Sequence, residues 1–116
     1  MNDIAFHREL AAHDARNVVL LARLAEKGVD LHAKRRIDLY FQANSESAAA
    51  QLAVAFKGGN FEAARTAGPS GASSQWSVEV GAHAAPEEVV AADYTRALIR
   101  LATDCNARYD GWGTEV

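Results

Sequence analysis

Apolar residues near the start of the chain recur at the spacing of a helix. Between residues 6 and 27, the positions that fall close to one stripe are Phe6, Leu10, Asn17, Leu20, Leu21 and Leu24. Lys27 and Gly28 form a standard helix end, because a cation suits the negative end of the helix dipole and glycine suits the residue after the last turn. We expect a long helix over 6–27 that is only half apolar and therefore needs a surface to lie on.

The next apolar pattern has a period of two, which is typical of a strand. Residues 36–43 alternate and place four apolar side chains on one face: Ile37, Leu39, Phe41 and Ala43. Asn44 and Ser45 then offer N-cap oxygens for a helix. The residues that follow at helical spacing are Ala49, Leu52, Ala53 and Phe56. The pattern predicts a strand and then a helix that ends at Gly58.

The second half of the chain continues this alternation. Residues 60–65 are expected to form a return strand, and residues 66–74, rich in glycine and serine, a loop. Residues 75–82 alternate again, and the side chains expected to point inward are Trp76, Val78 and Val80. Pro86 suits the first turn of a third helix, whose apolar stripe contains Val90, Tyr94, Ala97, Leu98, Leu101 and Cys105. A short last strand over 108–112 is expected to be broken by an Asp-Gly turn.

The order of these elements predicts the fold class. After the first helix they run strand, helix, strand, strand, helix, strand, which is the β-α-β-β-α-β order of a ferredoxin-like sandwich. We predict an α+β protein with a four-stranded antiparallel sheet and both helices on one face. It forms one domain, with an N-terminal helix over 1–28 and the ferredoxin-like part over 29–116. The first helix either covers part of the other sheet face or packs on an edge, and the sequence does not decide between these.

Composition and charge narrow the class of protein. A chain of 116 residues, 49% apolar and 23% charged, has the size and composition of a single folded domain. Its formal charge is −3 and its one basic cluster covers 34–36, so it lacks the patch with which nucleic-acid binders neutralise phosphates. The longest apolar run, 18–22, is far below the roughly 20 residues that span a bilayer. Cys105 is the only cysteine and the N-terminus lacks a signal-peptide pattern, so we expect a cytoplasmic protein.

The end of the chain resembles a known family. Tyr109-Asp110-Gly111-Trp112-Gly113-Thr114 is similar to the signature ending of the ribonuclease E inhibitor B family, also called regulator of ribonuclease activity B. Upstream, 24–31 resembles the family's helix-to-strand passage, 37–41 its first strand, and 47–49 with Gly58-Gly59 its first sheet helix. The resemblance implies a ferredoxin-like domain that binds protein and does not catalyse a reaction. In the family's named member, binding to the scaffold region of ribonuclease E inhibits RNA decay, so the resemblance implies ribonuclease E as the protein partner.

Four residues are candidates for contact with a partner protein. Tyr109, Asp110 and Trp112 surround the Asp-Gly turn and Tyr40 lies on the outer sheet face, and tryptophan and tyrosine are enriched among interface hot spots. The alternative is structural: Tyr109 packs inward, Asp110 accepts backbone hydrogen bonds in the turn, and Gly111 supplies a positive φ. Trp112→Ala separates the two interpretations. It weakens partner binding at an unchanged melting temperature in the first case and lowers the melting temperature in the second.

The sequence predicts no metal site, no cofactor site and no catalytic group. His7 and His13 lie about 120° apart around the first helix and cannot share a metal, while His32 and His83 come from scattered positions. Cys105 falls in an apolar stripe, where an unpaired cysteine usually behaves as a small hydrophobe. Nothing places a base, a nucleophile and an orienting group together, so we do not expect an enzyme.

The leading hypothesis is therefore a non-catalytic regulatory domain that works by protein contact, through the turn around Trp112 and the outer sheet face. The alternative is a small-molecule sensor, because sheets of this type pair edge to edge into homodimers and can hold ligands between helix and loop. Residues 66–74 would then be the ligand loop. A melting temperature that rises with a metabolite would favour the sensor, since a ligand that binds only the folded state stabilises it.

Overall fold

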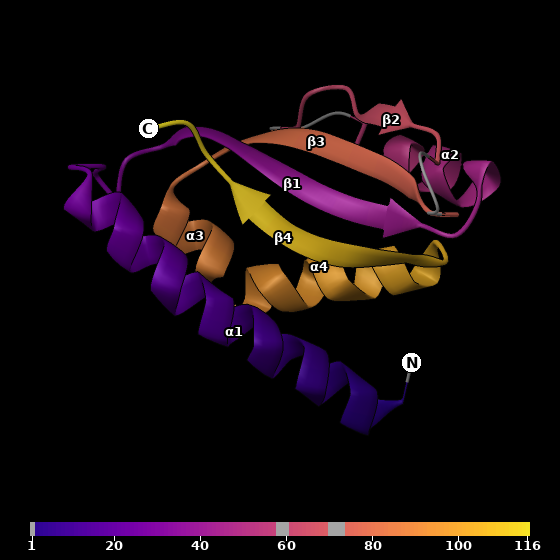
Figure 1. Ribbon diagram of the computed structural model, residues 1–116, viewed down its shortest axis with the longest axis horizontal. Coiled ribbons are helices and arrows are strands. Elements are labelled where there is room, and N and C mark those ends of the chain that lie inside the picture. Colours follow the sequence, from indigo (N-terminus) through magenta and orange to yellow (C-terminus); the bar gives the residue numbers. More distant parts are fainter. Residues whose placement is uncertain (1, 58–60, 70–73) are drawn as a thin grey trace.

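One antiparallel sheet of four strands organises the chain, and the helices pack on one of its faces (Figure 1). The computed structural model describes residues 2–57, 61–69 and 74–116. The strands are β1 (Arg35–Ala43), β2 (Arg65–Ala67), β3 (Trp76–Ala84) and β4 (Ala107–Gly113). They lie in the order β2-β3-β1-β4, so β4 forms one edge of the sheet. The predicted α+β class with a four-stranded antiparallel sheet is confirmed.

The helices are α1 (Asp3–Glu26), α2 (Glu46–Ala55), α3 (Pro86–Val90) and α4 (Ala92–Asp104). Side-chain caps explain two of their starts, because an N-cap oxygen satisfies one of the backbone N–H groups that the first turn leaves free. The backbone N–H of Ala5 donates to the Asn2 side chain at 2.7 Å, and that of Ala48 donates to Ser45 Oγ at 3.1 Å. The helix expected from residue 6 thus begins at Asp3.

The predicted single helix after residue 85 is wrong, because it is two helices separated at Ala91. That residue has ψ 141°, which is extended backbone. The hydroxyl of Thr95 donates to the carbonyl of Val89 at 3.2 Å and so gives that carbonyl a partner across the break. A buried side-chain hydrogen bond therefore stabilises the joint between α3 and α4.

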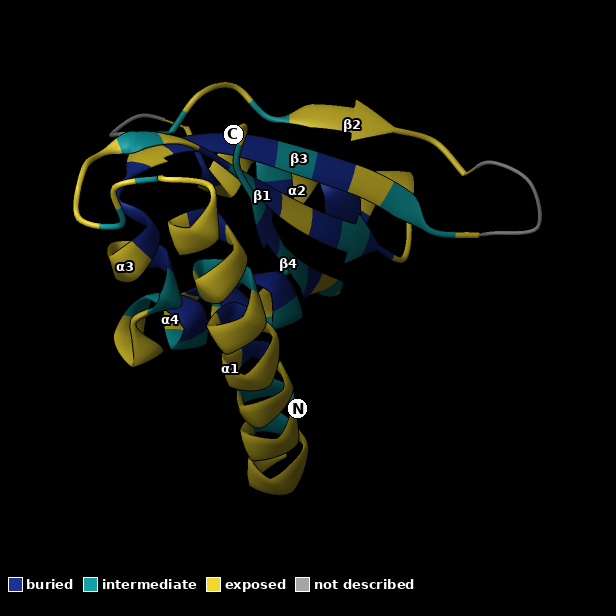
Figure 2. Cartoon of the chain, turned by 60° about the vertical axis from the view of Figure 1, so that its left-hand side comes forward, coloured by how far each residue is buried: buried dark blue, intermediate teal, exposed yellow. Residues whose placement is uncertain are grey.

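Strand alternation builds the core. The four apolar residues predicted on one face of β1 are all buried, as are Val78 and Val80 of β3, whereas Trp76 is only half-buried. They pack against Leu52 of α2 and Ile99 of α4. The buried face of the sheet is therefore the one that the helices cover, and Figure 2 shows the alternation along β1 and β3.

The return strand predicted over 60–65 is misplaced. Strand β2 covers Arg65–Ala67, where Thr66 pairs with Val78 of β3, and Phe61 makes only an isolated bridge with Ala82. Part of the predicted loop therefore belongs to the strand, while 70–73 and Asn60 lie outside the described residues. The cause is pairing with β3, which the weak strand propensity of 60–65 does not reveal.

The predicted Asp-Gly turn is also wrong, because β4 runs through it without a break. The pairing of β1 with β4 shifts between Tyr40 and Phe41: Tyr40 lies opposite Gly111 and Phe41 opposite Tyr109, so Asp110 is the extra residue. This is a β-bulge, which inserts one residue into a strand and bends it locally. Gly111 has φ +126°, so the predicted positive φ is confirmed.

Helix α1 packs beside α4 and along the β4 edge, and not over the outer sheet face (Figures 1 and 2). Its buried residues are His13, Asn17 and Leu24. Closer to its start, the guanidinium of Arg100 on α4 lies 5.1 Å from the centre of the Phe6 ring. Of the two placements that the sequence left open for this helix, the structure therefore has the one at an edge of the sheet. Among the described helices, none has the length and apolar character needed to cross a membrane.

Candidate functional site

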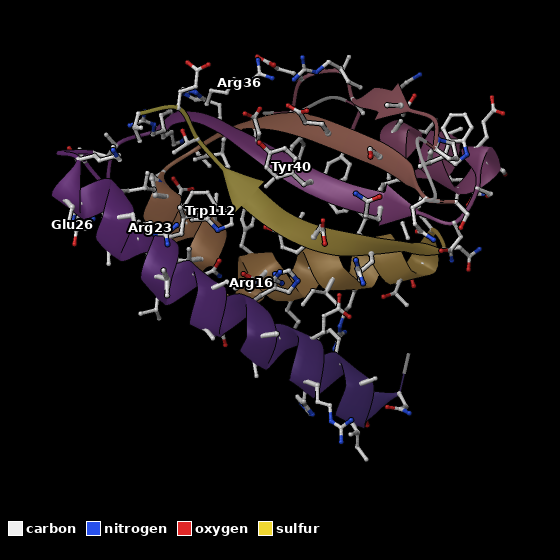
Figure 3. The ribbon with its side chains drawn as sticks, in the orientation of Figure 1. Arg16, Arg23, Glu26, Arg36, Tyr40 and Trp112 are labelled. Atoms are coloured by element: carbon white, nitrogen blue, oxygen red, sulfur yellow. The ribbon has the colours of Figure 1, made fainter. Side chains whose placement is uncertain are left out.

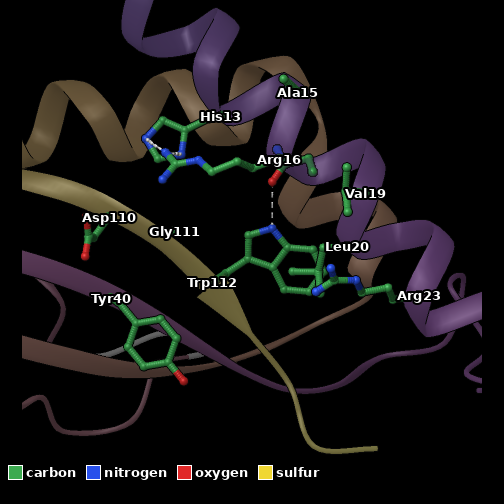
Figure 4. A pocket seen from close by; sticks show the side chains of 11 residues that line it. His13, Ala15, Arg16, Val19, Leu20, Arg23, Tyr40, Asp110, Gly111 and Trp112 are labelled. Atoms are coloured by element: carbon green, nitrogen blue, oxygen red, sulfur yellow. Dashed lines mark hydrogen bonds between the residues drawn. The ribbon is translucent and has the colours of Figure 1, made fainter.

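A groove runs between α1 and the edge strand β4, with a volume of about 580 Å³ (Figure 4). Its α1 wall contains Arg16, Val19, Leu20 and Arg23, and Trp112 of β4 lies between the two arginines. Figure 3 shows Arg16, Arg23 and Trp112 together in this region, away from Arg36. Most of the groove surface is apolar. Concave apolar surfaces with a few polar groups are typical binding sites.

Trp112 forms the floor of the groove and at the same time belongs to the core. It pairs with Leu39 of β1, and only 7% of its surface is exposed. Its indole Nε1–H donates to Asn17 Oδ1 at 2.9 Å, so its polar atom is satisfied within the protein. Trp112 therefore presents ring surface to the groove but is not a free, protruding anchor.

His13 and Tyr109 make a second contact between α1 and β4. Their rings stack with centres 4.6 Å apart, and His13 Nε2 lies 3.1 Å from the carbonyl oxygen of Tyr109. A carbonyl only accepts, so Nε2 carries the proton and donates. Arg16 donates to the other ring nitrogen, Nδ1, at 3.1 Å. The ring is therefore the neutral Nε2–H tautomer.

Burial controls the ionisation of both rings. It lowers the pKa of His13, and the charge of Arg16 lowers it further, while the Tyr109 carbonyl and the more distant Asp110 and Asp14 act in the opposite direction. Burial also raises the pKa of Tyr109 far above its usual value. The Tyr109 hydroxyl is buried and has no hydrogen-bond partner among the described residues. Both rings are therefore uncharged at neutral pH.

Tyr40 and Asp110 lie on the other side of the groove. Tyr40 is 38% exposed, and its pKa is raised by partial burial and by the charges of Asp38 and Glu79. Asp110 Oδ1 accepts from the Arg108 guanidinium at 3.4 Å, in place of the backbone donors that a turn would have supplied. Of the four predicted partner-binding residues, Tyr40, Asp110 and Trp112 line the groove. Tyr109 lies inward beneath them and is only 2% exposed.

The α1 wall of the groove was not predicted from the sequence. Arg16 and Arg23 are seven positions apart, which is almost two full helical turns, so both face the same side of α1. This spacing indicates that the two arginines share one face of the helix. It does not show which surface that face meets, because β4 lies some 90 positions further along the sequence and only the fold brings it beside α1.

In the part of the chain that the structure describes, the other reactive groups form no second site. Within 2–57, 61–69 and 74–116, no group of three or more His, Cys, Asp or Glu residues is arranged to hold a metal ion. His32 contacts Glu87 on the surface, outside the groove. Burial raises the pKa of the Cys105 thiol and so does the charge of Asp104, whereas a reactive cysteine needs a lowered pKa.

Comparison with known proteins gives a match over most of the chain. The family model described as "Regulator of ribonuclease activity B" matches residues 14–114. The matched range contains the groove residues from Arg16 on α1 to Trp112 on β4. A search of curated proteins finds no match.

Proposed function

The chain belongs to the regulator of ribonuclease activity B family, and from this premise we propose that it is a non-catalytic domain that modulates RNA decay by binding a ribonuclease, with ribonuclease E as the partner. The observation that carries the proposal is the family match over residues 14–114. A regulator of this kind needs a surface that recognises protein and has no need of a reactive centre.

The groove supports a role in protein contact. Its rim carries exposed side chains of the type found in protein interfaces: Val19 is 52% exposed and Tyr40 is 38% exposed. Next to Val19, Val18 is 68% exposed. We infer that Tyr40, Asp110 and Trp112 contact the partner from the β4 side, while Tyr109 supports them from beneath.

The strand order supports the ferredoxin-like assignment. A β-α-β-β-α-β chain of this type places its first strand beside its third and its last strand at an edge, and β2-β3-β1-β4 follows that order. We infer that residues 29–116 form the ferredoxin-like part. Helix α1 is then an addition that provides one wall of the binding groove.

The chemistry of the groove favours binding over catalysis. Among the described residues that line it, none is a serine, threonine or cysteine that could act as a nucleophile. Two of the described lining residues have the chemistry of a general base: His13 already uses both ring nitrogens in contacts with Tyr109 and Arg16, and Asp110 accepts from Arg108. The described groove therefore lacks a nucleophile and base in contact with each other.

The proposal is tested by adding the purified chain to purified ribonuclease E. Binding is measured by isothermal titration calorimetry, and activity by the cleavage rate of a fluorescent RNA. We expect binding and a changed cleavage rate with the wild type. Val19→Asp at the groove rim should abolish both, because it places a charge in an apolar interface. Val54→Asp on α2 is the matched control, since Val54 is 61% exposed and lies outside the groove. Absence of binding by the wild type, or loss with both variants, contradicts the proposal.

A further inference from the structure

We propose that the groove between α1 and β4 binds an acidic and apolar peptide segment, in which two carboxylates contact Arg16 and Arg23 and an aliphatic side chain between them packs on Trp112. This inference deepens the proposed function and rests on it for the identity of the protein that carries the segment. The peptide chemistry itself is argued from the groove.

The two arginines are available to a ligand. Both are exposed, and neither forms an ion pair within the described part of the chain. Other arginines are paired with carboxylates, among them Arg36, Arg65, Arg96 and Arg108. Arg16 also donates to His13, but a guanidinium has five N–H donors, so most of them remain for a carboxylate.

The spacing of the arginines sets the length of the segment. Seven residues of helix rise by about 10 Å, and Figure 4 shows Arg16 and Arg23 on opposite sides of the Trp112 ring. In an extended chain, side chains two positions apart share one face and lie about 7 Å apart, and the long arginine and glutamate side chains cover the remaining distance. The preferred segment therefore has two acidic residues two positions apart that face α1, with an apolar residue between them that faces Trp112.

The apolar floor sets the chemistry at the centre of the segment. Leu20 of α1 lines the groove beside Trp112, and the polar atom of the indole is already bonded to Asn17. A polar side chain placed here would lose water without gaining a partner, which costs free energy. Leucine and similar side chains instead gain from the burial.

Charge favours an acidic peptide over RNA. Asp110 lines the same groove, and carboxylates of the adjoining sheet face already pair with arginines. The described lining of the groove therefore offers two cations without an ion pair, in a chain of net charge −3, whereas a continuous phosphate backbone needs a longer row of cations. Two separate carboxylates match Arg16 and Arg23, which are on the α1 wall, away from the acidic groups on the sheet side.

The test uses the full chain labelled with ¹⁵N and the heptapeptide Gly-Ser-Glu-Leu-Glu-Ser-Gly, and binding is followed by nuclear magnetic resonance. The indole N–H signal of Trp112 reports on the groove, and that of Trp76 on β3 is the internal control. We expect concentration-dependent shifts of the Trp112 signal, with the Trp76 signal unmoved. Replacement of both glutamates by glutamine, or of the leucine by serine, should weaken binding.

Variants then connect the binding to the two arginines. Arg23→Ala and Arg16→Ala should each raise the Kd about 1.5- to 5-fold, the range for one exposed ion pair. Arg8→Ala, a cation on α1 that does not line the groove, should leave the Kd unchanged. The Arg23→Glu variant should bind more tightly to the peptide in which one glutamate is replaced by lysine than to the original peptide. Melting temperatures confirm that each variant is folded, and Arg23 is the decisive position because it does not contact His13.

The proposal is overturned if the peptide leaves the Trp112 signal unmoved up to millimolar concentration, if both arginine variants bind as the wild type does, or if a uridine dodecamer occupies the groove in preference to the peptide. Failure of the peptide proposal can be distinguished from failure of the proposed function. Peptide binding without an effect on ribonuclease E contradicts the function and leaves the groove chemistry standing. Regulation of ribonuclease E that is insensitive to Arg16 and Arg23 contradicts the groove chemistry alone.

Discussion

The side chain of Asn17 accepts a hydrogen bond from the indole Nε1–H of Trp112, at 2.9 Å and across 95 positions of the sequence. Asn17 belongs to α1 and Trp112 to β4, and both side chains are buried. A buried polar pair is costly to break, because the remaining partner is left without a hydrogen bond. The pair therefore fixes α1 against the edge of the sheet and with it the shape of the groove.

Replacing Asn17 by alanine should destabilise the fold. The Trp112 indole would lose its acceptor in a buried position, which costs about 1–3 kcal/mol of unfolding free energy. Urea unfolding measures the change. Val18→Ala, at a neighbouring position that is 68% exposed, is the control and should stay within about 0.5 kcal/mol of the wild type. Equal stability of the two variants would show that the pair does not anchor α1.

Trp112→Ala should lower the melting temperature strongly. The side chain is only 7% exposed and pairs with Leu39 in the core, and truncating a buried aromatic residue costs about 3–5 kcal/mol. Thermal unfolding followed by circular dichroism measures the loss. Trp76→Ala is a useful comparison, because Trp76 is half-buried and its truncation should cost less. A melting temperature unchanged by Trp112→Ala would favour the anchor interpretation made from the sequence.

Tyr109→Phe should stabilise the protein. The hydroxyl of Tyr109 is buried without a partner among the described residues. Such a group has lost its hydrogen bonds to water on folding and has gained none in return, which destabilises the folded state. Removing the oxygen keeps the ring stacked on His13 and packed against Phe41. We expect a gain of about 1 kcal/mol in urea unfolding. A loss of similar size would mean that the hydroxyl has a partner, such as a bound water.

Sequence patterns were sufficient to predict the elements whose environment repeats regularly along the chain. The period of two in 36–43 reports directly which side chains of β1 are buried, because one face of this strand is covered along its whole length. The cap at Ser45 is equally local, since its oxygen bonds a backbone group three residues away. Such signals do not depend on where the rest of the chain lies.

The errors arose where a distant partner decides the structure. Asp110-Gly111 is typical of a turn, yet pairing with β1 makes it a bulge inside a continuous strand. The polar residues His13 and Asn17 on α1 face inward because their acceptor and donor lie on β4, almost a chain length away. The candidate site was predicted only on its β4 side for the same reason.

Gly111→Ala should destabilise the protein without any steric clash. A Cβ at this position meets no atom within 4 Å, so the penalty comes from the backbone, whose φ of +126° is unfavourable for residues with a side chain. We expect a loss of about 1–3 kcal/mol in urea unfolding. Gly68→Ala is the matched control, because its Cβ would make ordinary contact with Trp76 at 3.5 Å and no positive φ is involved. Similar values for both variants would argue against backbone strain at the bulge.

Stability should decrease below about pH 6.5 because of His13. Its pKa is lowered from 6.5 in the folded protein, so the unfolded chain binds the proton first as the pH falls. The contribution of the neutral ring is therefore complete above pH 6.5 and is lost as the pH falls from 6.5 toward the folded-state pKa. Charging the ring would place a cation beside Arg16 in a buried position and remove the acceptor at Nδ1.

Urea unfolding at a series of pH values measures the slope of the unfolding free energy against pH. His13→Gln should flatten this slope, since glutamine keeps an N–H donor for the Tyr109 carbonyl but does not titrate. His83→Gln, at an exposed position on β3, should retain the slope of the wild type. A slope that survives in His13→Gln would assign the pH dependence to another group.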